Sequence, residues 1–143
     1  MINKELIFDE IATQLKWAVG YQLLTITSIC TDRMQTERIY STNTHEYPIR
    51  AIKSLYNDAW TVRVVYRAQA YFASCEEEMI AYFPDYLIAR GLGSVINIPI
   101  VIEDVVIATV NMLHIEYFYN KYHIERLAPF AEKMAQITNL FDR

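Results

Sequence analysis

The sequence predicts a single α+β domain with a central antiparallel sheet. Along the 143 residues, the patterning runs helix, two strands, a loop with short helices, strand, helix, two strands, helix, an order typical of that class. The second observation is a run rich in β-branched residues between Gly91 and His114, interrupted by two acidic residues. The third is a hydrophobic content of 53%, sufficient for a full core in one domain of this length. We therefore treat residues 1–143 as one domain.

The run from Gly91 to His114 is predicted to form a buried hairpin. Its strands are Ser94–Ile102 and Val105–His114, and the turn between them is Glu103 and Asp104. Neither turn residue is Gly or Asn, which are the usual residues in the left-handed backbone of such turns. Both faces of the ribbon are mostly apolar, so we expect it to lie in the interior of the sheet and to be covered on both sides.

The pairing of the two strands depends on the turn. A two-residue loop would place Ile98 opposite Thr109, with Asn97 and Asn111 on opposite faces. Pro99 lacks a backbone N–H and favours a bulge. A bulge there would shift the pattern by one residue and could bring Asn97 and Asn111 onto a common face.

The text GLGSVINIPI followed by VIATVNMLH resembles the paired strands of a GAF domain, in which a glycine-led strand with N-x-P is followed by G-T-x-N-x-x-H. Ala108 stands where that pattern usually has Gly, and the turn also lacks the usual Gly. The resemblance implies a GAF-like fold, with the N- and C-terminal helices packed on one sheet face and loops and short helices covering a pocket on the other. The resemblance also implies a small-molecule-binding or dimerisation module of signalling proteins, in which the terminal helices form a homodimer.

Composition narrows the classes of partner. The formal charge is −4 and no basic run occurs, so we expect neither nucleic acid nor an anionic membrane as a partner. The longest uncharged run, Trp17 to Thr31, is too short to cross a bilayer. No secretory leader follows Met1, and a cytoplasmic location with Cys30 and Cys75 reduced is the expectation.

The N-terminal part predicts a helix from Asn3 to Val19, capped by Asn3 and stopped by Gly20. Strands are expected over Tyr21–Thr31 and Thr36–Thr42, followed by a long loop with a helical turn around residues 52–56. The expected buried stripe of the helix consists of Leu6, Ile7, Ile11, Leu15 and Ala18.

In the C-terminal part, Asp58 is expected to cap a short helix, and Ala68–Ala73 to form a strand. Ser74 and Glu77 suggest a capping box for the next helix, and Pro84 is expected to restart a further helical turn. Pro129 lacks the N–H for one backbone hydrogen bond of the last helix. The continuous part of that helix is therefore predicted to begin near Pro129 or to kink there.

No catalytic motif, metal-ligand spacing or cofactor fingerprint occurs in the sequence, so we predict no catalytic residues, no metal and no cofactor. Buried polar side chains on strands must find partners, either in a neighbouring loop or in a ligand. Aromatic side chains under a long loop are core residues or pocket residues. The candidate ligand-binding residues are Tyr40, Trp60, Tyr66, Tyr82, Ser94, Asn97, Asn111 and His114.

Three functions stay open. The first is a regulatory module that binds an unidentified small molecule and signals through dimer or partner contacts. The second is a dimerisation or scaffold domain without a ligand. The third is a thiol-dependent reductase of free methionine sulfoxide, an activity found among stand-alone GAF-like proteins. The third is disfavoured because only Cys75 lies near the central strands and it lacks a resolving partner.

Overall fold

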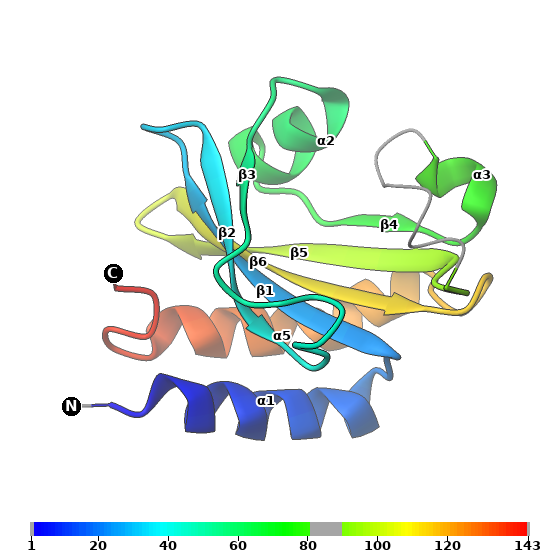
Figure 1. Ribbon diagram of the computed structural model, residues 1–143, viewed down its shortest axis with the longest axis horizontal. Coiled ribbons are helices and arrows are strands. Elements are labelled where there is room, and N and C mark those ends of the chain that lie inside the picture. The colour runs from blue at the N-terminus through cyan, green and yellow to red at the C-terminus, as the bar shows by residue number, and fades with distance from the viewer. Residues whose placement is uncertain (1, 81–89, 143) are drawn as a thin grey trace.

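The computed structural model describes residues 2–80 and 90–142, and Figure 1 shows how they are arranged. The sheet is antiparallel, six-stranded and ordered β3-β2-β1-β6-β5-β4. In chain order, the described elements are α1 (Lys4–Ala18), β1 (Leu23–Cys30), β2 (Gln35–Ser41), β3 (Ile52–Ser54), α2 (Ala59–Thr61), the π-helical turn η1 (Val62–Tyr66), β4 (Tyr71–Ala73), α3 (Glu76–Met79), β5 (Ser94–Ile102), β6 (Val105–His114) and α5 (Lys121–Gln136).

The sheet separates two layers of cover. α1 and α5 lie side by side against one face, and α2 and α3 lie over the other (Figure 1). The predicted α+β fold, with terminal helices on one face and short helices on the other, is confirmed. The β5–β6 hairpin lies inside the sheet, between β4 and β1, as expected from its two apolar faces.

α1 begins and ends where the sequence predicts. The Asn3 side chain accepts a hydrogen bond from Leu6 N at 3.1 Å, and Gly20, with φ 96°, follows the last turn. The expected buried stripe is partly wrong, because Leu6 is 53% exposed and Phe8 is buried. The helix is rotated so that the Phe8 ring enters the core, and the buried residues of α1 are Phe8, Ile11, Ala12 and Leu15.

The hairpin turn is tight despite having no glycine. Glu103 and Asp104 have φ values of 51° and 64°, the left-handed backbone of a two-residue turn of the primed type. The two-residue register holds only next to the turn, where Val101 lies opposite Val106. One extra residue, Ile107, then shifts the pairing, because Ile100 lies opposite Ala108.

The bulge lies in β6 near the turn and not at Pro99, and the expected pair of Ile98 with Thr109 is wrong. Pro99 faces Thr109 and Asn97 faces Asn111, so the two asparagines share a face as the bulged alternative allowed. The shift has a packing reason. It places Ala108, Val110 and Met112 in the core beside α1 and α5, and it collects the polar side chains on the opposite face.

The segment after β2 contains a strand where a helical turn was expected, so that prediction is wrong. Ile52 pairs with Glu37, and Ser54 pairs with Gln35. β2 would otherwise form the edge of the sheet with its outward N–H and C=O groups unpaired, and the extended chain of β3 satisfies them. β4 is shorter than predicted and begins at Tyr71.

α5 begins well before Pro129, which corrects the predicted start of this helix. Asn120 Oδ1 accepts a hydrogen bond from Tyr122 N at 2.9 Å, and His123 Nδ1 accepts one from Asn120 N at 3.0 Å. These caps and a buried stripe that includes Leu127 outweigh the hydrogen bond that Pro129 removes.

The expected capping box of α3 is also wrong in detail. The helix begins one residue later, so Cys75 is the N-cap residue and Glu78 takes the position expected for Glu77. Glu78 accepts from the Ser74 hydroxyl at 3.1 Å, and Glu116 accepts from Glu76 N at 2.9 Å. The helical turn expected after Pro84 falls outside the described residues.

Candidate functional site

A cavity of about 320 Å³ lies between the sheet and the segments that cover its second face. The floor comes from β1, β6 and β5, and the cover comes from β3 and the residues that follow it up to α2. Its polar lining residues include five threonines, two asparagines and three charged side chains. The lining consists of Leu23, Thr25, Thr27, Thr36, Arg38, Tyr47, Lys53, Ser54, Leu55, Tyr56, Asp58, Trp60, Thr61, Val95, Asn97, Thr109, Asn111 and Leu113.

Strand register places the polar side chains of the floor next to one another. Asn111 on β6 lies opposite Asn97 on β5 and opposite Thr25 on β1, while Thr27 lies opposite Thr109. Directly opposed residues of antiparallel strands point to the same face. The five side chains therefore form one polar surface in the middle of a sheet whose strands are otherwise largely apolar.

A directional chain of hydrogen bonds joins this floor to the cover. Trp60 Nε1 donates to Asn97 Oδ1 at 3.0 Å, and Asn97 Nδ2 donates to Asn111 Oδ1 at 2.7 Å. Asn111 Nδ2 then donates to Thr25 Oγ1 at 3.2 Å and to Thr27 Oγ1 at 3.1 Å. Since the indole N–H is only a donor, it fixes the orientation of both amides. The chain therefore ends on two hydroxyl oxygens that act as acceptors.

The charged side chains of the lining are two cations and one carboxylate. Arg38 lies opposite Thr27 on the neighbouring strand, and Lys53 pairs with Thr36 at the edge of the sheet. Asp58 caps α2, where its Oδ1 accepts from Thr61 N at 2.8 Å. With two cations and one carboxylate, the described lining has a net positive charge.

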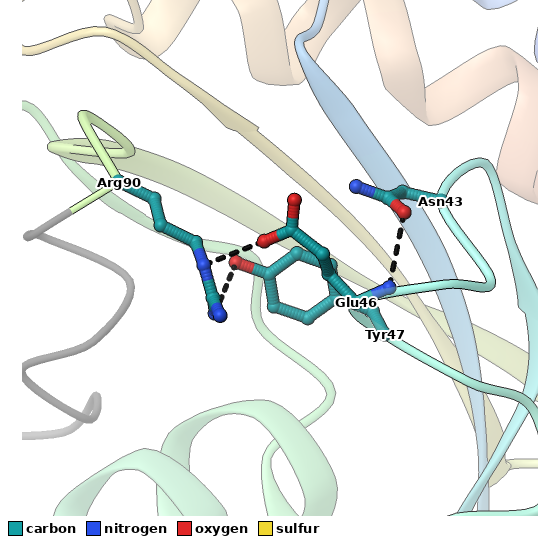
Figure 2. A network of polar contacts seen from close by, with 4 residues as sticks. All are labelled: Asn43, Glu46, Tyr47 and Arg90. Atoms are coloured by element: carbon teal, nitrogen blue, oxygen red, sulfur yellow. Dashed lines mark hydrogen bonds and ion pairs between the residues drawn. The ribbon is translucent and has the colours of Figure 1, made fainter.

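Tyr47 lines the cavity. Figure 2 shows the polar contacts around this residue. Arg90 Nη1 donates to the Tyr47 hydroxyl at 3.3 Å, and Arg90 Nε lies 2.6 Å from Glu46 Oε2. The guanidinium groups of Arg90 and Arg38 lie 5.4 and 5.8 Å from the centre of the Tyr47 ring. Asn43 Oδ1 accepts from Glu46 N at 3.1 Å and closes the turn that carries this tyrosine. These contacts tie residues 43–47 to the start of β5.

Of the eight candidate residues, Trp60, Asn97 and Asn111 line this cavity together. Tyr40 lies on the helix side of the sheet, where its hydroxyl donates to Asp9 Oδ1 at 2.7 Å and burial raises its pKa. Tyr66 is 50% exposed and donates to Asn57 Oδ1 at 2.8 Å. Neither tyrosine contributes to the cavity lining.

Two further candidates, Ser94 and His114, also lie outside the cavity lining. Ser94 is fully buried and its hydroxyl donates to Ile115 O at 2.7 Å. His114 stacks on the ring of Phe118, with the ring centres 3.6 Å apart, and burial lowers its pKa. Tyr82 lies outside the described residues. The structure therefore brings together Trp60 from the cover and Asn97 and Asn111 from the paired strands β5 and β6, and it places the other four described candidates elsewhere.

Sequence reasoning missed Thr25, Thr27, Thr109 and Arg38. A signal was present in β1, because Leu23, Thr25 and Thr27 alternate with Leu24 and Ile26, so both threonines share one face of an apolar strand. Thr109 was placed on the wrong face relative to Asn97 by the unshifted register. Arg38 has no sequence signal of this kind, because its role in the lining depends on strand pairing.

Other features of the described residues bear on the choice of site. A second cavity, of about 570 Å³, lies between the start of α1, β2 and the C-terminal residues, but no hydrogen-bond chain of this kind crosses its described lining. Cys30 and Cys75 are half-buried, and neither is among the described lining residues of the first cavity. Within residues 2–80 and 90–142, no cluster of three or more His, Cys, Asp or Glu side chains could hold a metal ion.

No helix in the described part of the chain is long and apolar enough to span a membrane. The sequence matches no protein-family model, and it matches no curated protein.

Solved structures resemble this fold closely. The GAF domain/HD domain protein from Geobacter sulfurreducens has a TM-score of 0.78 and 12% identity, over 100% of this chain and 99% of that chain. The GAF domain of a two-component sensor histidine kinase from Bacillus halodurans has a TM-score of 0.75 and 13% identity, over 99% and 95%. The GAF domain of a phosphoenolpyruvate-protein phosphotransferase from Coxiella burnetii has a TM-score of 0.75 and 13% identity, over 94% and 82%. The chain therefore has the fold of GAF domains.

Proposed function

We propose that this chain is a regulatory module of the GAF type that binds a small molecule in the cavity between the sheet and its cover. The observation that carries the proposal is the hydrogen-bond chain from Trp60 through Asn97 and Asn111 to Thr25 and Thr27. Apolar side chains would fill the same space at a lower cost in desolvation, so a polar floor facing a cavity favours recognition over packing. A volume of about 320 Å³ suits a small metabolite.

The known roles of structurally similar domains support a sensory function. Such domains come from two-component sensor histidine kinases, from a methyl-accepting chemotaxis protein and from a far-red cyanobacteriochrome photoreceptor. Their identities to this chain are 10–16%, so the support concerns the class of role and not the ligand.

The sheet offers a short path from the cavity to the terminal helices. On β1, Thr25 faces the cavity, while its neighbours Leu24 and Ile26 are buried in the core formed with α1 and α5. On β6, Asn111 lies between Val110 and Met112 in the same way. A ligand that shifts the floor would therefore displace residues that contact the helices. For signalling, the ligand must bind two arrangements of this sheet with different affinities.

The output would pass through α1 and α5, either to a second copy of the chain or to a cytoplasmic partner. On α1, Leu6 and Trp17 are 53% and 88% exposed. They are separated by three helical turns, so they lie on the same side of the helix, and they offer apolar surface to another chain. Light scattering of the protein and of Trp17→Glu tests the dimer, which the substitution is expected to dissociate.

Ligand binding is tested by a thermal-shift screen with a broad set of metabolites and by native mass spectrometry of the purified protein. We expect at least one compound to raise the melting temperature, and we expect this effect to be lost in Asn97→Leu. Gln14→Leu, which makes a similar amide-to-leucine change at an exposed position of α1 outside the lining, is the control. The alternative of a scaffold without a ligand predicts that no compound binds and that the protein purifies without a small molecule. The cysteines lie outside the described lining, so a thiol reductase has less support.

A further inference from the structure

We propose that the ligand carries an acid group, a carboxylate or a phosphate, that accepts hydrogen bonds from Thr25 and Thr27 and pairs with Arg38. The inference rests on the proposed function, because it concerns the ligand of the same cavity. Three features of the lining carry it: the direction of the hydrogen-bond chain, the charge beside its end and the apolar walls.

The direction of the hydrogen-bond chain determines whether the Thr25 and Thr27 hydroxyls donate to a ligand or accept from it. Both hydroxyl oxygens accept from Asn111 Nδ2, so each hydroxyl proton points away from the amide. Among the described residues, no acceptor receives a hydrogen bond from either hydroxyl. The two threonines therefore present two donors to the cavity, and the complementary ligand group is an acceptor with more than one lone pair.

Arg38 adds a positive charge at the same place. It lies directly opposite Thr27 on β2, and its side chain lines the cavity. Its Nη1 donates to Pro48 O at 3.0 Å, which uses one of the five N–H groups of the guanidinium. No carboxylate among the described residues forms an ion pair with Arg38. An oxyanion would receive both the threonine donors and this cation, a charge-assisted arrangement stronger than one between neutral groups.

The rest of the lining defines the other end of the ligand. Leu23, Val95 and Leu113 are buried, share the face of the polar floor and line the cavity beside it. They would contact an apolar body attached to the acid group. A cationic ligand of the same shape would meet Arg38 and two hydroxyl donors, and a neutral amide would satisfy the donors without the charge pairing.

Three probes of nearly equal size and shape separate these cases: benzoate, benzamide and benzamidine. Trp60 reports binding, because its indole donates to the floor, and Trp17→Phe removes the only other tryptophan, which is exposed. In that background, we expect fluorescence titration to give a dissociation constant for benzoate at least tenfold below those of benzamide and benzamidine. Added salt should weaken benzoate binding and should leave benzamide binding unchanged.

Matched variants locate the acid group. Arg38→Gln and the double variant Thr25→Val with Thr27→Val should each weaken benzoate binding by at least tenfold. Arg33→Gln removes the same charge from an exposed turn outside the lining and should leave it unchanged. Melting temperatures show whether each variant is folded, and inorganic phosphate used as a competitor of benzoate shows whether a phosphate occupies the same position.

Asn111→Asp provides a test of direction. A carboxylate at this position would still accept from Asn97 Nδ2, and the threonine hydroxyls would turn to donate to it. The cavity would lose both donors and gain a negative charge, so benzamidine should replace benzoate as the preferred probe. Equal or tighter binding of benzamide or benzamidine to the unsubstituted floor, or no binding of benzoate, would overturn the inference. The metabolite screen would still decide the proposed function, since a neutral or cationic hit supports binding without an acid group.

Discussion

The two faces of the sheet are formed by neighbouring residues of the same strands and differ in what they contain. On β1, Leu24 and Ile26 are buried against α1 and α5, and Thr25 and Thr27 line a cavity. On β6, the same alternation separates Val110 from Asn111. One face is packed with apolar side chains, and the other holds a polar surface and an open volume of about 320 Å³.

This difference separates stability from recognition. On the helix side, each side chain contributes by filling space and by the apolar area it buries. On the cavity side, hydrogen bonds between side chains satisfy the polar groups of the floor and fix their orientation. Substitutions on the two faces should therefore have separable effects on unfolding and on ligand binding.

The largest effect is expected on the helix side. Ile26→Ala should lower the free energy of unfolding by about 3 kcal/mol, because Ile26 is 1% exposed and its truncation leaves a hole in a packed core. The adjacent substitution Thr27→Val, on the other face of the same strand, should change it by less than about 0.5 kcal/mol, since Asn111 keeps Thr25 as an acceptor. Urea unfolding measures both. Equal losses in the two variants would mean that the cavity side is packed as tightly as the helix side.

Breaking the hydrogen-bond chain should have an intermediate effect. Asn97→Leu leaves the Trp60 indole N–H without its acceptor and Asn111 Oδ1 without its donor. We expect a loss of about 1–2 kcal/mol in the free energy of unfolding, the lower part of the range for unsatisfied groups, because water can enter the cavity.

A double-mutant cycle with Trp60→Phe isolates the contact between the indole and Asn97. We expect the two losses to be less than additive, because each substitution breaks the same hydrogen bond. Additive losses would show that Trp60 and Asn97 act independently. The indole N–H would then not determine the orientation of the Asn97 and Asn111 amides.

The element order, the central hairpin and both ends of α1 were predictable because each depends on local pattern: β-branched runs, a capping asparagine and a stopping glycine. The register of the hairpin was not, since the bulge at Ile107 is decided by which side chains the helices on one face can bury. β3 escaped prediction for a related reason. Its three exposed residues carry little pattern, and it is extended because β2 has an edge to pair.

The candidate site was also predictable only in part. Asn97, Asn111 and Trp60 stood out as polar or amphipathic side chains among apolar neighbours, and they meet in the cavity. Tyr40 and Tyr66 are aromatic like Trp60 but lie outside the cavity, Tyr40 in the core on the helix side and Tyr66 half-exposed, because an aromatic residue alone does not show which face it occupies. Arg38 could be placed only by strand pairing.

Acid pH should destabilise the packing on the helix side of the sheet. It should not affect the hydrogen-bond chain in the cavity, because that chain contains no titratable group. His114 Nδ1 accepts from Ile115 N at 2.8 Å, and His123 Nδ1 accepts from Asn120 N, so both bonds require a neutral ring. Burial lowers the pKa of each histidine below its ordinary 6.5. The unfolded state then binds more protons as the pH falls, so this stability is complete above about pH 6.5 and is lost on acidification.

The melting temperature should accordingly fall between about pH 7.5 and about pH 5.5. The double variant His114→Asn with His123→Asn keeps an acceptor at the δ position and should reduce this fall. His45→Asn, in an exposed histidine, should not. An equal pH dependence in all three proteins would assign the effect to groups other than these two histidines.

The smallest effect is expected at the turn that joins β5 to β6, which belongs to neither face. Asp104 has φ 64°, a conformation that costs a residue with a Cβ more than it costs glycine. Asp104→Gly should raise the free energy of unfolding by about 0.5 kcal/mol, because relief of this strain exceeds the greater flexibility of glycine in the unfolded chain. Asp32→Gly, in the turn between β1 and β2 where the aspartate has no positive φ, should lower it instead. Since the turn lies outside the cavity lining, probe binding should be the same in both variants, and a change in binding would show that the register set near Ile107 extends its influence to the floor.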